Sequence, residues 1–418
     1  MTTPVMVPTR ATRGHSARLR RLRVDQVAAD VFIVLALLVG FGIPGDVINL
    51  APTISLLVAM IGVGALLLAP VPDVLTARVS PWLILFAIWA FLSRGWGDSA
   101  DLWKSAFIRE IPIALVFMVV VGTVPFTRIV ELIKMVTIWA IVACFAAAVL
   151  TPYKSTQHLD PETGEPVLPG WHGTFGHKNG MAAFLLFGAL TFIVFETRPW
   201  RRNAVLAASL LLIVLGNSGT GLAGGIVLLI AGVWLRNYQR LPSRTTPSFV
   251  VATTISAIAA LFITILAAPF IVNLYGKDLT FTGRTQIWSA SLDFIGPERW
   301  HGYGIGNVWV NPDVEPTVSL NRQIGFIAGH AHSAPLNLML ELGVIGLALF
   351  LLAYLAAVAR GARLLRLDPE VGFWMLMVAT LHFVFGLSET ATWGSWLLLI
   401  ALLYSARLQS PAPESVPP

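Results

Sequence analysis

Long apolar blocks with almost no charge are the feature that most limits how this chain can fold. A helix needs about 20 apolar residues to cross a bilayer. Such blocks recur along the chain, in which 56% of the 418 residues are hydrophobic and only 12% are charged. A typical soluble domain carries about twice that charged fraction. The sequence therefore predicts an all-α, polytopic membrane protein rather than two or three soluble domains.

The apolar blocks predict about twelve transmembrane helices, because a bundle also tolerates spans somewhat shorter than the bilayer thickness requires. The expected spans are 26–43, 50–70, 80–93, 111–125, 129–150, 177–196, 203–216, 218–235, 249–271, 333–358, 371–388 and 391–407. Only a small polar turn separates 203–216 from 218–235.

Arginines in the short loops between spans predict the orientation, because cytoplasmic loops carry an excess of Lys and Arg. If the basic segment 9–23 is cytoplasmic, the loops after even-numbered spans are cytoplasmic too. These loops contain Arg78, Arg128, Arg198, Arg201, Arg202, Arg236, Arg240, Arg244, Arg360, Arg363 and Arg366. The pattern predicts a multi-pass protein of the inner (cytoplasmic) membrane with both termini in the cytoplasm. The net charge of +6 then reports orientation and not binding to nucleic acid.

The alternation of cytoplasmic and outer loops along the predicted spans divides the chain into five parts. They are a basic cytoplasmic tail (1–25), transmembrane helices 1–9 (26–271), a large extracytoplasmic loop (272–332), transmembrane helices 10–12 (333–407) and a cytoplasmic tail (408–418). No A-x-A cleavage site follows the first apolar block, which is therefore expected to stay as a span. Segments 94–110 and 151–176 are also expected outside. A loop as long as 272–332 usually binds or catalyses.

Segment 151–176 leads directly into His177, Lys178 and Asn179 at the start of a span. A helix N-terminus presents unpaired N–H groups and partial positive charge, which together with basic side chains suit an anion. A surface loop with a basic membrane anchor accounts for the same residues equally well. The segment therefore predicts one of these two arrangements on the outer face.

The long loop contains one predicted helix and one predicted turn. Residues 283–295 have the apolar spacing of a helix that lies along the membrane interface, and Arg284 opens it. The guanidinium could grip phosphate oxygens through two parallel hydrogen bonds, or it could be an interfacial arginine that reaches toward water. Gly302, Gly304 and Gly306 resemble a nucleotide loop only superficially, since no strand is expected before them. A tight turn that returns the chain to the membrane is expected instead.

Two histidines end the long loop. His330 and His332 precede a span for which Ser333 is the expected N-cap and Pro335 a first-turn residue. A neutral imidazole at this mouth could accept a proton from a hydroxyl nucleophile. Two histidines one residue apart could also suggest zinc, but no third ligand stands at a matching spacing. The lone Cys144 excludes an intrachain disulfide and a cysteine metal cluster, so neither a metal nor a cofactor is expected.

Further polar residues are expected inside and beside the last spans. Asn337 and Glu341 are four residues apart and share a helix face one to two turns below the histidines. A carboxylate at that depth needs a partner or water. His382 and Glu389 bracket the outer end of the next span and could join the same mouth. The preferred interpretation is that they are two satisfied polar residues of the bundle.

Taken in order, these segments resemble the signature of the O-antigen ligase and polymerase superfamily. The run His332-Ser-Ala-Pro-Leu336…Glu341-Leu-Gly343-Val-Ile-Gly346-Leu resembles the family's H-N-x-x-L…E-x-G-x-x-G-L signature. Gly283-Arg284…Trp288 resembles its G-R-x-x-x-W element, and Gly302-Tyr-Gly304-Ile-Gly306 resembles its G-x-G-x-G segment. Gly173-Thr-Phe-Gly-His177-Lys178-Asn179 is similar to the G-x-F-x-H-K-N stretch of the exopolysaccharide-polymerase branch. The motifs cover roughly the C-terminal half to two-thirds of the chain, and the ordered set is more specific than any one motif.

The resemblance implies a GT-C-like membrane fold and a metal-independent, inverting glycosyltransferase. The implied donor is a glycan linked to polyprenyl diphosphate, and the implied acceptor is a hydroxyl of a glycan or glycolipid, with membrane lipids around the enzyme. The family's loop arginine and the histidine after the loop carry over to Arg284 and His332. Arg284 would bind the diphosphate leaving group, and His332 would activate or orient the acceptor. A cationic clamp plus a base is chemically sufficient for such a transfer.

The chain departs from the family pattern at two positions. The family usually has Ser-Arg or Ser-Lys near the start of span 218–235, where this chain has Asn217-Ser218-Gly219-Thr220. A second cation would then come from Lys178, Arg94 or Arg322, with Lys178 preferred. The second departure is Ser333, which replaces the usual Asn. The substrate-binding candidates are Lys178, His177, Asn179, His330, Arg322 and Glu341.

Two other classes of protein compete with the enzyme. A transporter of a lipid-linked sugar or a small anion should concentrate polar residues at the bilayer midplane and break helices in repeated halves, whereas the candidate His and Arg residues lie at one face. A membrane scaffold subunit would leave the long polar loop unexplained. The sequence does not separate a ligase from a polymerase, because both use one donor site and differ in the acceptor.

Overall fold

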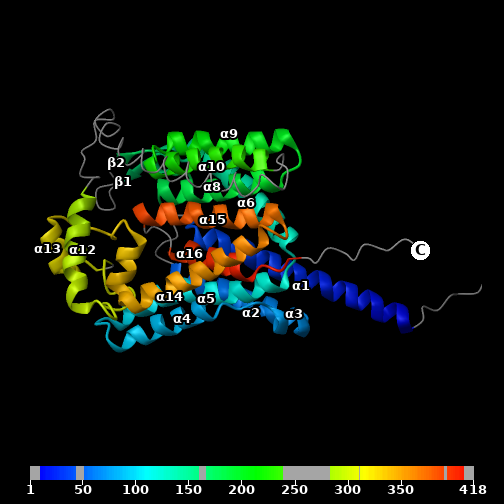
Figure 1. Ribbon diagram of the computed structural model, residues 1–418, viewed down its shortest axis with the longest axis horizontal. Helices are drawn as coiled ribbons and strands as arrows, with labels where there is room; N and C mark the ends of the chain where they lie inside the picture. The colour runs from blue at the N-terminus through cyan, green and yellow to red at the C-terminus, as the bar shows by residue number, and fades with distance from the viewer. Residues whose placement is uncertain are drawn as a thin grey trace, which may run out of the picture.

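The computed structural model describes residues 10–43, 51–159, 166–238, 283–309, 311–389 and 393–408 as a helical bundle with one short β-hairpin (Figure 1). The helices are α1 (Arg10–Gly40), α2 (Ala51–Leu68), α3 (Val71–Thr76), α4 (Pro81–Leu92), η2 (Ser93–Gly95), α5 (Ala100–Thr123), α6 (Phe126–Leu150), α7 (Pro152–Thr156), α8 (Lys178–Phe195), α9 (Pro199–Leu215), α10 (Gly219–Tyr238), α12 (Arg284–Glu298), α13 (Thr317–Ile324), α14 (Ala334–Leu364), α15 (Pro369–Ser388) and α16 (Trp393–Ser405). The antiparallel hairpin pairs β1 (Gln157–Leu159) with β2 (Pro166–Pro169).

The helices confirm the predicted all-α polytopic membrane fold. Within the described residues, α5, α6, α8, α14 and α15 contain stretches long and apolar enough to cross a membrane, and α2, α4, α10 and α16 contain shorter apolar stretches. Each expected span that falls in the described part of the chain coincides with a helix. The expected span 249–271 and the start of the long loop, 272–282, lie outside the described residues.

Two helices begin more than ten residues before the predicted spans. Helix α1 already begins at Arg10, so much of the expected basic tail continues the first helix. Helix α5 begins at Ala100 instead of 111, so most of the polar segment 94–110 is helical. Its start has a side-chain cap, since the Ser99 hydroxyl accepts a hydrogen bond from the Leu102 N–H. Such a cap satisfies one of the unpaired N–H groups at a helix start and lets polar residues extend the span.

The bundle has distinct sides and ends (Figure 1). Helices α8, α9 and α10 lie on one side of α15, and α2 and α4 lie on the opposite side of the molecule. Helices α12 and α13 stand at one end beside the hairpin, whereas the first turns of α1 project from the other end. Helix α8 is the most enclosed, because every residue from Asn179 to Phe192 is buried.

A break in α14 attaches the long loop to the bundle. Gly343 has φ +66° and interrupts the helical hydrogen bonds, so carbonyls of the preceding turn face other partners. The Leu340 carbonyl accepts a hydrogen bond from the Tyr303 N–H at 2.8 Å, and the Leu342 carbonyl accepts one from Trp89 Nε1 at 2.9 Å. A Cβ at Gly343 would lie 2.3 Å from the Trp300 carbonyl carbon. The segment 302–306 is thus the expected tight turn, and it packs on the backbone of α14.

Candidate functional site

A buried carboxylate, Glu389, lies at the centre of the candidate site. It caps the C-terminal end of α15 and is 5% exposed. Its Oε1 accepts a hydrogen bond from Arg284 Nη2 at 2.6 Å and another from Asn179 Nδ2 at 2.7 Å. Since Arg284 opens α12 and Asn179 lies in the first turn of α8, one carboxylate fixes three separate helices relative to one another.

Arg284 reaches this carboxylate because of the backbone that precedes it. Gly283 adopts φ +84° as the N-cap of α12, a conformation that favours glycine, and a Cβ there would lie 2.7 Å from the Phe326 ring. Among the described residues, Glu389 engages only Nη2 of the guanidinium, and the buried Nε has no hydrogen-bond partner. The arginine therefore keeps a donor for a further acceptor.

His332 approaches the other oxygen of the same carboxylate. Its Nδ1 lies 3.5 Å from Glu389 Oε2, longer than a well-formed hydrogen bond. The residue has φ +47°, a left-handed conformation that costs energy for a residue other than glycine and clusters at functional sites. The ring centroids of His332 and His330 lie 3.9 Å apart, and the backbone N–H of His332 donates a hydrogen bond to His330 Nδ1 at 3.2 Å. The turn thus presents both imidazoles together.

The start of α8 supplies a third part of the cluster. His177 caps the helix, with its Nδ1 accepting a hydrogen bond from the Asn179 N–H at 3.2 Å. The Asn179 amide bridges two groups, because its Nδ2 donates to Glu389 while its Oδ1 accepts from the Ser218 hydroxyl at 2.6 Å. Lys178 lies beside His177, and its charge acts on that imidazole.

The protonation of the cluster follows from burial and from its charges. Burial lowers the pKa of His177 to about 4, and the neighbouring Lys178 contributes in the same direction. Burial and His332 likewise lower the pKa of His330 to about 4. Burial alone would raise the pKa of the Glu389 carboxyl, but His332 and Arg284 bring it below its ordinary value. At neutral pH the cluster therefore contains an ionised carboxylate beside two neutral imidazoles.

The structure brings together most of the residues selected from the sequence. Arg284, His332, His330, His177 and Asn179 meet around Glu389, with Lys178 at the edge.

Two other candidates lie elsewhere. Arg322 is exposed on α13 and has no contact with the cluster in the described part of the chain. Glu341 is buried, its Oε1 accepts from Asn337 Nδ2 at 3.2 Å, and its charged neighbours are Glu110 and Arg109 of α5. The binding roles of Arg322 and Glu341 stay predictions without a geometric link to the cluster.

Three smaller expectations need adjustment. Ser333 occupies the N-cap position of α14, but its side chain makes no capping hydrogen bond. Ser218, noted only as the place where a cation is missing, hydrogen-bonds Asn179 and so supports the cluster. The preferred interpretation of Glu389 as a satisfied bundle residue needs correction, because only Oε1 is hydrogen-bonded, the buried Oε2 has no hydrogen-bond partner among the described residues, and the carboxylate is the centre of the site. Its position beside the outer mouth was the only sequence signal for this role.

A metal site is not apparent in the side chains that can be described. Over residues 10–43, 51–159, 166–238, 283–309, 311–389 and 393–408, no group of three or more His, Cys, Asp or Glu side chains could hold a metal ion. The cationic side chains at the cluster are Arg284 and Lys178.

The chain is similar to one protein family and to a curated protein of polysaccharide production. Residues 204–351 match the family model of O-antigen ligase, a range that contains Arg284 and His332 but ends before Glu389. Over 288 residues, 66% of this chain, the sequence is 24% identical to the exopolysaccharide production protein ExoQ of Rhizobium meliloti (strain 1021), of which the chain spans 64%. Both findings confirm the predicted resemblance of this chain to the O-antigen ligase and polymerase superfamily.

Proposed function

We propose that the protein is a membrane glycan ligase or polymerase. It transfers an oligo- or polysaccharide from polyprenyl diphosphate to an acceptor hydroxyl at the outer face of the cytoplasmic membrane. The observation that supports the proposal is the shared carboxylate Glu389, whose Oε1 binds Arg284 Nη2 at 2.6 Å and whose Oε2 faces His332 Nδ1 at 3.5 Å. A cation for a leaving group and an imidazole for a nucleophile are thus fixed beside each other at the ends of apolar helices.

The transfer needs one bond to form and one to break. The acceptor oxygen attacks the anomeric carbon of the donor sugar, and the bond from that carbon to the diphosphate oxygen breaks. Polyprenyl diphosphate leaves with the bonding electrons, and the hydroxyl proton passes to His332. Attack from the side opposite the leaving group inverts the anomeric carbon, in keeping with the inverting reaction that the family resemblance implies.

Arg284 is suited to bind the leaving group because Glu389 positions its guanidinium but does not engage all of its N–H donors. Glu389 engages Nη2, whereas the buried Nε has no hydrogen-bond partner in the part of the chain that the structure describes. Phosphate oxygens pair well with several guanidinium N–H groups at once. Lys178 at the start of α8 supplies the second positive charge, so the site retains a net attraction for a diphosphate beside the single charge of Glu389.

Glu389 is suited to orient His332. If Nδ1 of the imidazole carries the proton, that proton faces the carboxylate and Nε2 is left with a free lone pair. A carboxylate also stabilises the imidazolium that forms when Nε2 accepts a proton, as in other pairs of histidine and acid. The distance of 3.5 Å would shorten as the positive charge develops.

A transporter is less well supported by the same geometry. The break in α14 at Gly343 could suggest the discontinuous helix of a transporter. However, the carbonyls freed at this break are occupied by the loop of the same chain, through Tyr303 and Gly304. A transporter predicts flux in proteoliposomes without a glycosylated product.

The test is glycan transfer by membranes that contain Arg284→Ala or His332→Ala. Transfer should fall by a factor of about 100 or more, as for loss of an electrostatic or acid–base group. Arg299→Ala is the matched control, because Arg299 is an exposed arginine at the other end of α12. Full activity in both variants, with protein level and membrane insertion unchanged, would refute the proposal. After deletion of the gene, accumulation of full-length lipid-linked chains indicates a ligase, and accumulation of single repeat units indicates a polymerase.

The proposed orientation has its own test. In a Cys144→Ala background, a cysteine replaces the exposed Arg322 of α13. An impermeant thiol reagent should label it in cells whose cytoplasmic membrane is intact. Labelling only after lysis would reverse the topology.

A further inference from the structure

A second polar feature lies at the opposite end of α14 from Glu389. A pocket of about 630 Å³ opens there between the ends of α14 and α16 and the segment that precedes α4. It is lined by Thr76, Arg78, Gly122, Ala356, Ala359, Arg360, Arg363, Leu364, Leu367, Tyr404, Ser405, Ala406, Arg407 and Leu408. The lining contains four arginines and no acidic residue. The excess of positive charge in this pocket favours the binding of an anion.

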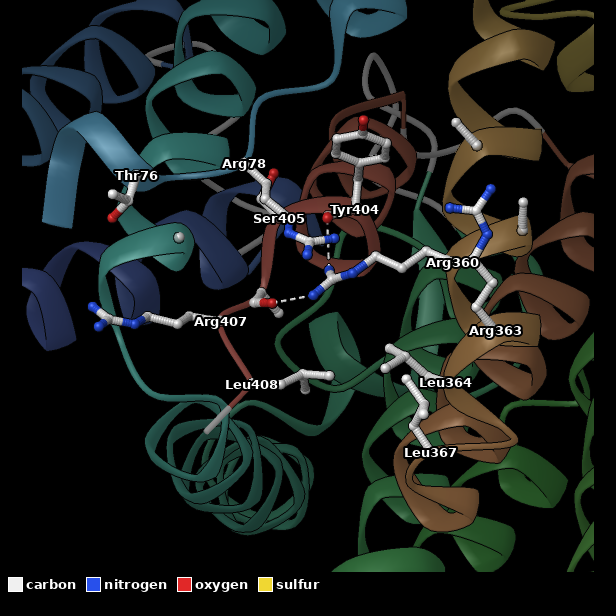
Figure 2. A pocket seen from close by; sticks show the side chains of 14 residues that line it. Thr76, Arg78, Arg360, Arg363, Leu364, Leu367, Tyr404, Ser405, Arg407 and Leu408 are labelled. Carbon is white, nitrogen blue, oxygen red and sulfur yellow. Dashed lines mark hydrogen bonds between the residues drawn. The ribbon is translucent and has the colours of Figure 1, made fainter. Parts of the chain in front are cut away.

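Arg360 is the fixed element of this pocket (Figure 2). Its guanidinium donates to the backbone carbonyls of Leu403 at 2.8 Å and Tyr404 at 2.6 Å, and also to that of Ala406. It thereby ties α14 to the carbonyl end of α16. Arg78 comes close enough for the two positive charges to repel each other, and Figure 2 shows the Arg360 side chain reaching toward it.

The remaining charges of the pocket are not balanced from within. Arg407 forms an ion pair with Asp73, with Nη1 and Oδ1 2.5 Å apart. In the part of the chain that the structure describes, the exposed side chains of Arg78 and Arg363 have neither a hydrogen-bond nor an ion-pair partner. Among the described residues, Arg78, Arg360 and Arg363 are therefore held together at this end without a carboxylate paired to any of them.

Ser405 gives an independent indication of a ligand. Ser405 lines the pocket and is 1% exposed, and its buried Oγ has no hydrogen-bond partner among the described residues. A buried hydroxyl without a partner costs free energy, and in a pocket lined by cations a bound acceptor oxygen would satisfy it. The arginine N–H groups of the same pocket match the several acceptor oxygens of a phosphate.

We propose that this pocket binds the phosphate group of an anionic ligand, and that the ligand is a membrane phospholipid. Leu364, Leu367 and Leu408 give part of the wall an apolar surface, which suits the start of an acyl chain. Basic pockets between transmembrane helices on the cytoplasmic side commonly take lipid phosphates. The positive-inside rule does not require arginines of separate segments to line one pocket, as Arg78, Arg363 and Arg407 do here. The inference does not depend on the proposed transferase activity.

The test measures lipid binding by the full chain in detergent, with native mass spectrometry. The variant is Arg78→Gln together with Arg363→Gln, since both side chains are exposed and their loss should not disturb folding. Arg366→Gln is the matched control, because it removes an exposed arginine near the end of α14 that does not line the pocket. The ligands are phosphatidylglycerol, phosphatidylcholine and inorganic phosphate, and melting curves verify that each variant is folded.

The wild-type chain should prefer phosphatidylglycerol to phosphatidylcholine, and the double variant should bind phosphatidylglycerol about tenfold more weakly while the control stays close to wild type. Competition by inorganic phosphate at millimolar concentration, with loss of binding in the double variant, would retain the phosphate site but assign it to a soluble ligand. Equal retention of phosphatidylglycerol by the wild type and the double variant would overturn the proposal.

Discussion

The two ends of α14 handle positive charge in opposite ways. At the start of the helix, Arg284 is held by the buried carboxylate Glu389, with Oε1 2.6 Å from Nη2. Near its end, Arg360 is held by backbone carbonyls, and the neighbouring Arg78 repels it. The ends are about 45 Å apart for a helix of this length. A cation paired with a carboxylate has a fixed direction, which suits catalysis. Several cations without a carboxylate partner suit the binding of an anion.

The largest expected effect removes the carboxylate that defines the first end. Glu389→Ala frees Arg284 and His332 together, so glycan transfer should fall about 100-fold to 1,000-fold. Glu370→Ala is the control, since Glu370 is an exposed acid in the first turn of the same helix, α15. Both variants are compared with the wild type in a membrane transfer assay. Near-normal transfer by Glu389→Ala would remove the functional contrast between the two ends.

The second prediction concerns the break between the two ends. Gly343→Ala puts a Cβ 2.3 Å from the Trp300 carbonyl carbon at a backbone with φ +66°. The chain should lose about 2–4 kcal/mol of stability or fail to fold. Gly64→Ala in α2 is the control, because a Cβ there meets nothing within 4 Å. The melting temperature in detergent and the monodisperse fraction measure the effect. A stable Gly343→Ala variant would show that the break does not anchor the loop.

A smaller effect is expected one contact away from the carboxylate. Ser218→Ala removes the hydroxyl that bonds Asn179 Oδ1 at 2.6 Å, so Asn179 should orient Glu389 less well. Transfer should fall about tenfold, in line with one hydrogen bond of about 1–1.5 kcal/mol. Ser209→Ala is the control, because Ser209 is also buried but its hydroxyl has no hydrogen-bond partner within the described segments. Equal activity of the two variants would place Ser218 outside the functional network.

The smallest expected effect is a dependence of stability on pH. Of the two ends of α14, only the end beside His330 should contribute to it. The pKa of His330 is lowered to about 4, so the unfolded chain binds more protons than the folded chain between about pH 4 and 6.5. Stability should therefore be complete above pH 6.5 and decline as the pH falls toward 4. The melting temperature should drop by a few degrees from pH 7.5 to pH 5. His330→Gln should reduce that drop, and an unchanged drop would assign it to other groups.

Much of the fold could be predicted from the sequence because the membrane demands it. Apolar blocks form helices in a bilayer whatever their neighbours, so the described spans coincide with the predicted ones. The break at Gly343 could not be predicted, because a glycine in an apolar pattern is compatible with a continuous helix. The break needs the backbone of Trp300, which is distant in the sequence.

The site could be predicted only in part for a similar reason. Arg284 and His332 lie in ordered motifs, so the family resemblance points to them. Glu389 is separated from Arg284 by 105 positions and from Asn179 by 210, and no local pattern links them. From the sequence, the segment with Ser218 indicates only that the family's usual cation is missing. Its hydrogen bond to Asn179 is not apparent there, because Asn179 lies 39 positions away. The charged chemistry of this site comes from long-range contacts, which the spacing of residues does not encode.

The most direct measurement is a double-mutant cycle on the transfer rate with Glu389→Gln and Arg284→Gln. Glu389→Gln keeps the side-chain volume, Arg284→Gln shortens the side chain, and both substitutions remove charge. If Glu389 acts by holding Arg284, the double variant should transfer within about threefold of the slower single variant, because each change removes the same arrangement. If the two losses instead multiply, the residues act independently, and the claim that one carboxylate organises the site is contradicted.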